Sequence, residues 1–332
     1  MGCAGGCSAA FQRTQGWRFG MTQKTPKRGQ QVTVLGLGAI GAAVARTLLE
    51  SGMKVTVWNR TQSKAASLAD AGAVVAIFPA EAIAASPLVI SCLWDYAFTD
   101  EVFGQDGVEA ALDGKVFVQL STGSSQEAKR QGSWVEARGA SFLAGGVMCF
   151  PRAIGAEETI ILYAGDPEVF KKHADLLANL APAQQHVGNR PGDAAPAYLA
   201  LWSFYFSGMG GFLDGLAMLS AHDLTKDNVK ALVAPMANKL VDGMFDLMGR
   251  LDSHNFARDQ TTVSSMEGGL GDTCDQIRKA GVEPLMLEAF VRRLAIAPAH
   301  GRGDEDIAAV ADLLMSQASS IDGRLELNRR QS

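Results

Sequence analysis

Short runs of β-branched and other apolar residues alternate with Ala-rich stretches from Gln31 to about residue 181. Such runs are typical of buried strands, and the stretches between them have the periodicity of helices. The strands are predicted at residues 31–35, 54–58, 74–77, 88–93, 116–120, 141–143 and 159–164. The helices are predicted at residues 42–50, 63–71, 80–85 and 125–137, and after Pro167. Because strand and helix alternate strictly, we predict an α/β fold with a doubly wound parallel sheet.

The pattern changes beyond the last predicted strand. Residues 184–192 are rich in Gly, Asn and Pro, and we interpret them as a linker. Helical periodicity prevails after it, so a sheet domain at 31–183 is expected to precede an all-helical domain at 193–316. Residues 1–30 lack periodicity and are predicted to be a disordered extension, and residues 317–332 a flexible tail.

One stretch, residues 194–213, contains no charged side chain and is long enough to span a bilayer. An acidic residue stands at each end of this stretch, Asp193 before it and Asp214 after it, and no Lys or Arg cluster flanks it. We therefore interpret it as a buried helix of a soluble protein rather than a membrane span. Small residues recur at every fourth position and would let a second helix approach closely: Ser203, Ser207 and Gly211. This face is a candidate subunit interface.

Composition and charge narrow the range of partners. The chain has 332 residues, of which 47% are hydrophobic and 20% charged, which fits folded domains rather than disorder. Its net charge of -5, with scattered Lys and Arg, favours neither a nucleic-acid nor a membrane partner. The five cysteines are widely spaced, and Cys3 and Cys7 have no further ligands nearby. We expect reduced thiols in a cytoplasmic protein, no metal site, and small-molecule or protein partners.

A glycine motif lies between the first predicted strand and the first helix. It reads Gly36, Leu37, Gly38, Ala39, Ile40 and Gly41. In this position the first glycine makes a tight turn, the second lets the backbone approach a pyrophosphate, and the third lets helix and strand pack closely. The amides at the start of the helix then face the phosphates. We predict a Rossmann-type dinucleotide site, the alternative being a glycine-rich turn without a ligand.

The end of the second predicted strand indicates which dinucleotide is bound. NAD enzymes carry Asp or Glu here, whereas this chain has Asn59, Arg60 and Thr61, followed by Lys64. Arg60 can pair with a 2′-phosphate in a bidentate manner, Asn59 and Thr61 can donate hydrogen bonds, and Lys64 adds positive charge. We therefore expect NADPH rather than NADH, with a solvated basic loop as the alternative.

Loops after later strands should surround the nicotinamide, because ligands of such sheets bind at the carboxyl ends of the strands. Two loops that follow apolar runs have small, polar or aromatic residues suited to this place. We expect four of these residues near the cofactor: Leu93, Trp94, Ser121 and Thr122. Ordinary loop packing is the alternative for each of them.

Several motifs together resemble a known family. They are residues 34–41, residues 57–61, the segment 145–148 with Pro151 and Gly155 behind it, and the late segment 300–303. Over residues 31–316 the chain resembles bacterial NADPH-dependent imine reductases and reductive aminases, of the β-hydroxyacid and 6-phosphogluconate dehydrogenase superfamily. The resemblance implies hydride transfer from NADPH to the carbon of cyclic imines or iminium ions. It also implies a long interdomain helix and a homodimer whose subunits exchange helices and share active sites.

Tyr198 distinguishes the branches of this superfamily. The hydroxyacid dehydrogenases resemble one another in having an active-site lysine here, whereas imine reductases commonly have Asp or Tyr. Reducing a C=N bond needs a proton at nitrogen, which a phenol can donate, while a cationic lysine would repel an iminium. We predict that Tyr198 is the catalytic residue, with a packing tyrosine as the alternative. Tyr96 occupies the place of an Asn in reductive aminases, which leaves true reductive amination open.

The substrate pocket is predicted to be apolar and aromatic, although helix core is an alternative use for most of its candidates. The candidates are Tyr96, Met148, Trp202, Phe206 and Met236. His300 is interpreted as a helix-terminal histidine or as a contact to substrate or cofactor. Two other functions remain alternatives to imine reduction: a hydroxyacid-type dehydrogenase of the same fold, and a protein that binds NADPH without turnover.

Overall fold

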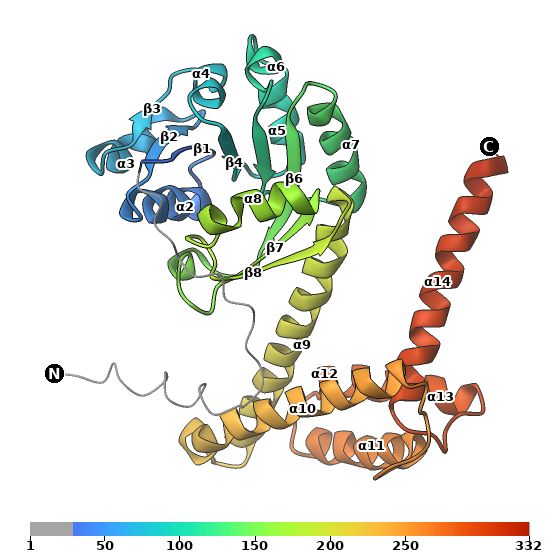
Figure 1. Cartoon of the computed structure of the whole chain (residues 1–332). Helices are drawn as coiled ribbons and strands as arrows, with labels where there is room; N and C mark the ends of the chain where they lie inside the picture. The colour runs from blue at the N-terminus through green and yellow to red at the C-terminus, as the bar shows by residue number, and fades with distance from the viewer. Residues whose placement is uncertain (1–28, 332) are drawn as a thin grey trace. The chain divides into compact units, whose positions relative to one another are not determined.

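The computed structural model describes residues 29–331 of the chain, with side chains up to residue 319. The predicted extension, apart from Gly29 and Gln30, and both Cys3 and Cys7 lie outside the described residues. The chain forms two compact units, one that ends at Trp202 and one that begins at Ser203 (Figure 1).

The first unit is built on one sheet of eight strands. They are β1 (Gln31–Leu35), β2 (Lys54–Trp58), β3 (Val74–Val75), β4 (Leu88–Ser91), β5 (Val116–Gln119), β6 (Ser141–Val147), β7 (Ile160–Gly165) and β8 (Ala183–Gly188). Their order across the sheet is β3-β2-β1-β4-β5-β6-β7-β8. The first six are parallel, and their order is that of dinucleotide-binding sheets. The predicted doubly wound sheet is confirmed for these strands.

The last two strands differ from the prediction. β7 runs antiparallel to β6, since the connection between them holds only a 3-10 turn, η2 (Pro151–Ala153), and an antiparallel neighbour needs no crossover helix. β8 pairs parallel with β7 and lies where we expected the linker, so the linker prediction is wrong for residues 184–188. β8 has the polar run Gln184, Gln185 and His186 because it is an edge strand that is mostly not buried, which removes the apolar signal.

Helices connect the strands and cover both faces of the sheet (Figure 1). They are α2 (Ala39–Glu50), η1 (Gln62–Ala65), α3 (Ala66–Asp70), α4 (Pro79–Ala84), α5 (Tyr96–Phe103), α6 (Val108–Ala111), α7 (Ser125–Glu136), α8 (Pro167–Leu177) and η3 (Pro191–Asp193). α2 begins three residues before its predicted start at residue 42, and no helix was predicted for α5. Both differences bear on the site, because these two helices begin at its edge.

The core of this unit lies in two layers, one on each face of the sheet. In β1, Val32 and Val34 face the layer formed with α2 and α8, whereas Leu35 belongs to the layer formed with α4, α5 and α7. Thr33 points to the second layer, where its buried hydroxyl donates to the Ala82 carbonyl at 2.6 Å. Burial on both faces explains why these strands are continuous apolar runs.

The described residues of the second unit form helices and loops without a strand, as predicted for residues 193–316. Its last helix continues over residues 317–331, where we predicted a flexible tail. α9 (Ala194–Ala221) begins in the first unit and ends in the second. It is followed by η4 (Lys226–Asn228), η5 (Lys230–Leu232), α10 (Val233–Asp252), α11 (Val263–Lys279), α12 (Leu285–Leu294), α13 (Ile296–Ala299) and α14 (Ala308–Gln331). A small apolar cluster joins α11 to α14, with Val263, Leu294, Ala297 and Val310 at its centre.

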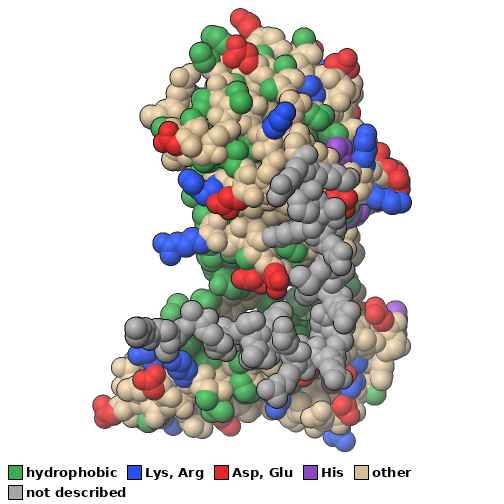
Figure 2. Space-filling view, turned by 60° about the vertical axis from the view of Figure 1, so that its left-hand side comes forward, with side chains coloured by type: hydrophobic (Ala, Val, Ile, Leu, Met, Phe, Trp, Pro, Cys, Tyr) green, Lys and Arg blue, Asp and Glu red, His purple; other side chains and the backbone are tan. Residues whose placement is uncertain are grey.

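α9 displays an unusual amount of apolar surface in the single chain. Large side chains on all sides of it are exposed, among them Leu199 at 60%, Phe206 at 55% and Leu213 at 59%. Exposed hydrophobic side chains are visible on the surface drawn in Figure 2, between scattered charged ones. Among the described residues, no helix has the length and apolarity needed to cross a membrane. A helix that is apolar all round requires a partner to cover it.

Candidate cofactor and active site

A cavity of about 800 Å³ opens at the carboxyl ends of the parallel strands. Its lining comes from the first unit: the turn after β1, the loops after β2, β4 and β5, the end of β6, and the start of α9. The chain order reverses between β1 and β4, and ligands of open parallel sheets bind beside such a switch point. The cavity therefore lies where the fold favours a ligand.

The glycine motif forms the floor of this cavity at the β1–α2 turn. Gly36 has φ +88°, and a Cβ there would come 2.7 Å from the Cys92 carbonyl oxygen, so the turn needs glycine. A Cβ at Gly41 would collide with the Gly36 carbonyl oxygen, whereas one at Gly38 would meet only open space. No side chain caps α2 at Gly38, which leaves the first amides of the helix for a ligand.

Asn59 connects this turn to the loop after β2. Its Oδ1 accepts from the Leu37 amide at 2.9 Å, and its Nδ2 donates to the Thr61 carbonyl at 2.9 Å. The side chain of Leu37 packs into the core instead of lining the cavity. Asn59 thus joins the glycine turn to the loop after β2, and its phosphate contact stays a prediction.

The basic side chains of the β2 loop lie at the cavity edge, where Arg60 and Lys64 are both exposed. The Arg60 Nη1 lies 3.9 Å from the Glu101 Oε2, and its guanidinium carbon lies 5.2 Å from the centre of the Phe98 ring. An exposed guanidinium held this loosely is available to a phosphate.

The loops after β4 and β5 form the opposite wall and run side by side through the bridge Asp95–Thr122. Leu93, Trp94, Ser121 and Thr122 all line the cavity, and Trp94 is 80% exposed. The Ser121 hydroxyl is buried without a hydrogen-bond partner among the described residues. A buried donor of this kind is expected to meet a polar group of a ligand.

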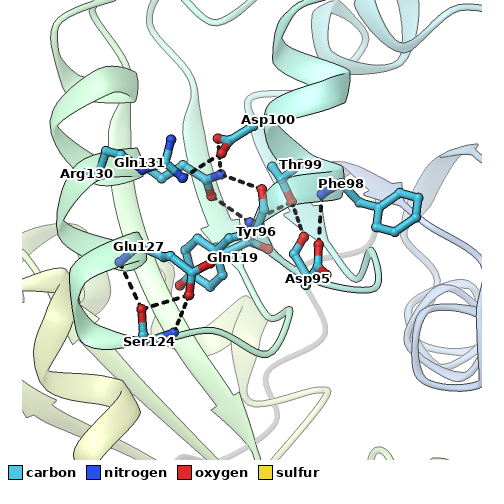
Figure 3. Close-up of polar contacts among 10 residues, drawn as sticks. All are labelled: Asp95, Tyr96, Phe98, Thr99, Asp100, Gln119, Ser124, Glu127, Arg130 and Gln131. Atoms are coloured by element: carbon cyan, nitrogen blue, oxygen red, sulfur yellow. Dashed lines mark hydrogen bonds and ion pairs between the residues drawn. The ribbon is translucent and has the colours of Figure 1, made fainter.

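A buried polar network supports this wall from behind (Figure 3). The Gln119 side chain donates to the Thr99 hydroxyl at 2.8 Å and to Gln131 at 2.7 Å, and it accepts from the Ser121 amide at 3.2 Å. Gln131 in turn donates to the Tyr96 carbonyl at 3.3 Å. The network therefore holds the two wall residues Tyr96 and Ser121. Sequence reasoning missed it, although a Gln at the end of the apolar run 116–120 was a signal for it.

Asp100 continues the network toward the surface. It accepts from Gln131 at 2.9 Å and from Arg130 at 2.6 Å, so α5 and α7 are joined by a chain of polar contacts (Figure 3). The Asp95 side chain caps α5 by accepting from the Phe98 amide at 2.8 Å. The position of α5 against the cavity is thus set at both its start and its middle.

Two phenols line the cavity. Tyr198, near the start of α9, lies over Gly146 of β6, and its ring meets the edge of Trp202 at 6.2 Å between centroids. The Tyr96 ring packs over Gly123 and is 3% exposed. Burial, with a smaller effect of the Glu127 charge, raises the pKa of Tyr96 well above its usual value. Tyr96 therefore keeps its proton at neutral pH.

The cavity brings most of the predicted residues together. Those that line it are Gly36, Gly38, Ala39, Ile40, Asn59, Arg60, Thr61, Lys64, Leu93, Trp94, Tyr96, Ser121, Thr122, Tyr198 and Trp202. Leu37 and Gly41 lie behind the turn, and Met148 is absent from the lining although its neighbours Val147 and Cys149 belong to it. Phe206 and Met236 belong to the second unit, so their place in a pocket stays a prediction.

One face of α5 was missed because no helix was predicted there. Phe98, Glu101 and Gln105 are spaced along this helix and its end so that they share one side, and all three line the cavity. Cys92, which follows β4, also lines it. The spacing of the α5 residues was visible in the sequence, but which side faces a ligand was not.

The glycine turn at a helix N-terminus, the basic loop after β2 and the cavity at the switch point define a dinucleotide-binding domain of the Rossmann type. Comparisons with known proteins agree with this class. Residues 31–188 match the family model for the NAD binding domain of 6-phosphogluconate dehydrogenase. Residues 190–316 match the model for the C-terminal domain of proteins like the NADPH-dependent reductive aminases.

Individual relatives match this chain over most of its length. An NADPH-dependent reductive aminase from Aspergillus oryzae is 26% identical over 286 residues, which are 85% of this chain and 96% of that protein. The structure of an imine reductase from Pseudomonas has 32% identity and a TM-score of 0.81, with 86% of this chain and 100% of that one covered. A reductive aminase from Aspergillus terreus, in complex with NADPH and ethyl levulinate, has 31% identity and a TM-score of 0.78, with 86% and 99% covered. The chain belongs to the family of NADPH-dependent imine reductases and reductive aminases.

Proposed function

We propose that this chain is an oxidoreductase that reduces the C=N bond of imines or iminium ions, cyclic ones in particular, to amines with NADPH. The observation that carries the proposal is that a phenol, Tyr198, lines the same cavity as the glycine turn of a dinucleotide site. The reaction needs a hydride at carbon and a proton at nitrogen. Bound NADPH would supply the hydride.

The cofactor would be held along the loops after β1, β2, β4 and β5. The amides at the start of α2, which no side chain caps, suit a pyrophosphate, and Arg60, Lys64 and Thr61 suit a 2′-phosphate. The Ser121 hydroxyl, which has no partner among the described residues, is available to the amide of the nicotinamide end. These residues thus fit both ends of the dinucleotide.

Tyr198 would hold the substrate nitrogen. A phenol O–H is a hydrogen-bond donor, so this side chain can protonate or hydrogen-bond the nitrogen as the carbon accepts hydride. Trp202 lies beside it, and the exposed Phe150 meets the Trp202 ring edge-on at 6.1 Å. These aromatic rings suit an apolar imine.

The distribution of cations favours this reaction over oxidation of a hydroxyacid. Among the described residues that line the cavity, the Lys and Arg side chains are Arg60 and Lys64, both in the loop after β2. Tyr198 lies over β6, which is four strand spacings from β2 in the sheet, or roughly 19 Å at about 4.8 Å per strand. A substrate carboxylate near Tyr198 would therefore find no cation in this lining.

A second copy of the chain is the partner that we propose for α9. Its apolar side chains are exposed in the single chain, and so are the small residues Ser203, Ser207 and Gly211, whose spacing lets another helix approach. A homodimer with shared active sites would cover this surface. Sedimentation should give twice the mass of the chain, and a monomer with full activity would refute this part of the proposal.

One assay tests the proposed reaction. Purified protein is mixed with NADPH and a pyrroline, and the loss of NADPH absorbance is followed beside the oxidation of a panel of hydroxyacids with NADP⁺. We expect turnover of the cyclic imine alone. Turnover of hydroxyacids alone would support the related dehydrogenase activity, and tight NADPH binding without any turnover would support a binding protein.

A further inference from the structure

The cavity contains an acidic side chain that a site for NADPH does not require. Glu101 lies on α5, lines the cavity and is within 3.9 Å of Arg60, the residue best suited to the 2′-phosphate. We propose that Glu101 is a cofactor-specificity residue, which competes with the 2′-phosphate for Arg60 and thereby lowers the preference for NADPH over NADH. The proposal rests on the cofactor site described under the proposed function.

The geometry of α5 aims two side chains at the same guanidinium. Phe98 and Glu101 are one helical turn apart, so they lie on one face of the helix. The Arg60 guanidinium lies 5.2 Å from the centre of the Phe98 ring and, through Nη1, 3.9 Å from Glu101. The start of α5 is fixed by the Asp95 cap and its middle by the contact of Asp100 with Gln131. Glu101 is therefore held on a rigid element beside Arg60.

The pair is loose enough to exchange. The Arg60 and Glu101 side chains are 75% and 64% exposed, and exposed ion pairs of this kind contribute little. A 2′-phosphate, which has a larger charge and can bind the guanidinium in a bidentate manner, should displace the carboxylate. The carboxylate nevertheless remains on α5, a short distance from the phosphate, and repels it.

The two cofactors respond differently to this carboxylate. NADPH brings a phosphate that both competes with Glu101 and is repelled by it. NADH has a ribose hydroxyl instead, which leaves the Arg60–Glu101 pair intact and can donate to a carboxylate, the interaction that NAD enzymes obtain from an acid at the end of the second strand. In this chain the acid would approach from α5. Glu101 should thus weaken the binding of NADPH and leave that of NADH unchanged or slightly improved.

The test is the binding of NADP⁺ and NAD⁺ to the full chain and to Glu101→Gln, measured by titration calorimetry at low and high salt. We expect NADP⁺ to bind roughly three- to tenfold more tightly to the variant at low salt, with a smaller gain at high salt, because the interaction is between exposed charges. The affinity for NAD⁺ should change by less than about twofold.

A matched control removes another exposed acid that pairs with an arginine. The Glu109 Oε1 lies 3.0 Å from the Arg138 Nε, and Glu109 does not line the cavity. The change Glu109→Gln should therefore leave the affinities for NADP⁺ and NAD⁺ unchanged. A second control makes the Glu101 change in an Arg60→Ala background. Since the guanidinium is the shared partner, the gain in NADP⁺ affinity should fall by more than half in that background.

Three results would overturn the proposal: an unchanged ratio of the two affinities in Glu101→Gln, an equal gain for both cofactors, or an undiminished gain without Arg60. Failure of the proposed function has a different signature. A wild-type chain that binds neither NADP⁺ nor NAD⁺ would refute the cofactor site itself. A chain that binds NADP⁺ but reduces no imine would refute the reaction and leave the role of Glu101 to be decided by the affinities.

Discussion

Gly146→Ala is the change that tests the place of Tyr198 most directly. A Cβ at Gly146 would lie 2.6 Å from Cδ2 and 3.0 Å from Cβ of Tyr198. Carbon atoms in contact settle at about 3.5–4.0 Å, so the overlap is about 1 Å. Gly146 is buried in β6 and faces Leu162 of β7 in the ladder, which holds its backbone in place. The ring of Tyr198 must therefore move.

The size of the effect follows from this overlap. A displacement of about 1 Å of a catalytic group can lower the rate by about 10²-fold. The loss of a general acid lowers it by a similar or larger factor, on the order of 10²–10⁴. We therefore expect kcat with a pyrroline to fall by about 10²-fold in Gly146→Ala, and by about as much in Tyr198→Phe. Extra bulk in a packed site should also lower the free energy of unfolding by about 1–3 kcal/mol.

The assay combines steady-state kinetics with the affinity for NADP⁺ and a denaturation curve. NADP⁺ affinity should stay within about twofold of wild type, since the change lies at β6 rather than at the loops of the dinucleotide. Gly243→Ala is the matched control, because a Cβ there meets no atom within 4 Å and the residue lies in α10. In a Tyr198→Phe background, Gly146→Ala should add little, since both changes remove the same phenol function.

Full activity of a folded Gly146→Ala variant would refute the reasoning, since it would mean that the Tyr198 ring need not lie where the structure has it. Independent losses that multiply in the double variant would also refute it, because the two changes would then act on different steps. A variant that loses activity together with NADP⁺ binding would show that the strand, rather than the phenol, had been disturbed.

Arg60→Ala should raise the KM for NADPH by at least about tenfold more than that for NADH, because only NADPH has the phosphate that a bidentate guanidinium binds; equal effects in steady-state kinetics would reject the assignment. Gln119→Leu should lower the free energy of unfolding, measured in urea, by about 2–4 kcal/mol. The change leaves the Thr99 hydroxyl, the Gln131 side chain and the Ser121 amide without their bond to Gln119. The same change at the exposed Gln185 should have little effect. Burial raises the pKa of the Cys92 thiol from 9.0 to about 12, so the native state binds this proton more tightly than the unfolded state. The stability from this group is fully present below pH 9 and is lost as the pH rises toward about 12, and urea unfolding of Cys92→Ser should show a weaker decline over that range.

The parts of the fold that were predicted correctly depend on neighbours in the sequence. The bounds of β1 and β2 agree with the prediction, because apolar runs buried on both faces differ sharply from the polar loops around them. The glycine turn could be predicted for a similar reason. A positive φ at Gly36 and the close approach of the Gly36 carbonyl to Gly41 restrict which residues can stand at these positions.

The parts that were missed depend on contacts across the fold. Nothing local marks β8 as a strand, since its polar residues are explained by its place at the sheet edge. β7 runs antiparallel to β6 because the connection between them contains only a 3-10 turn and no crossover helix. The direction of β7 became evident only from the pairing of the strands. The network around Gln119 joins three elements, and its members became a group only once β5, α5 and α7 were side by side.

The amino-acid sequence by itself determined the class of fold, the dinucleotide turn and the basic loop that favours a 2′-phosphate, because each depends on the sterics or charge of a few consecutive residues. Only the tertiary structure decided that Tyr198 lies over Gly146 and that Glu101 meets Arg60. Both pairs are far apart in the chain, and each forms because the sheet brings the ends of distant strands and helices to one edge.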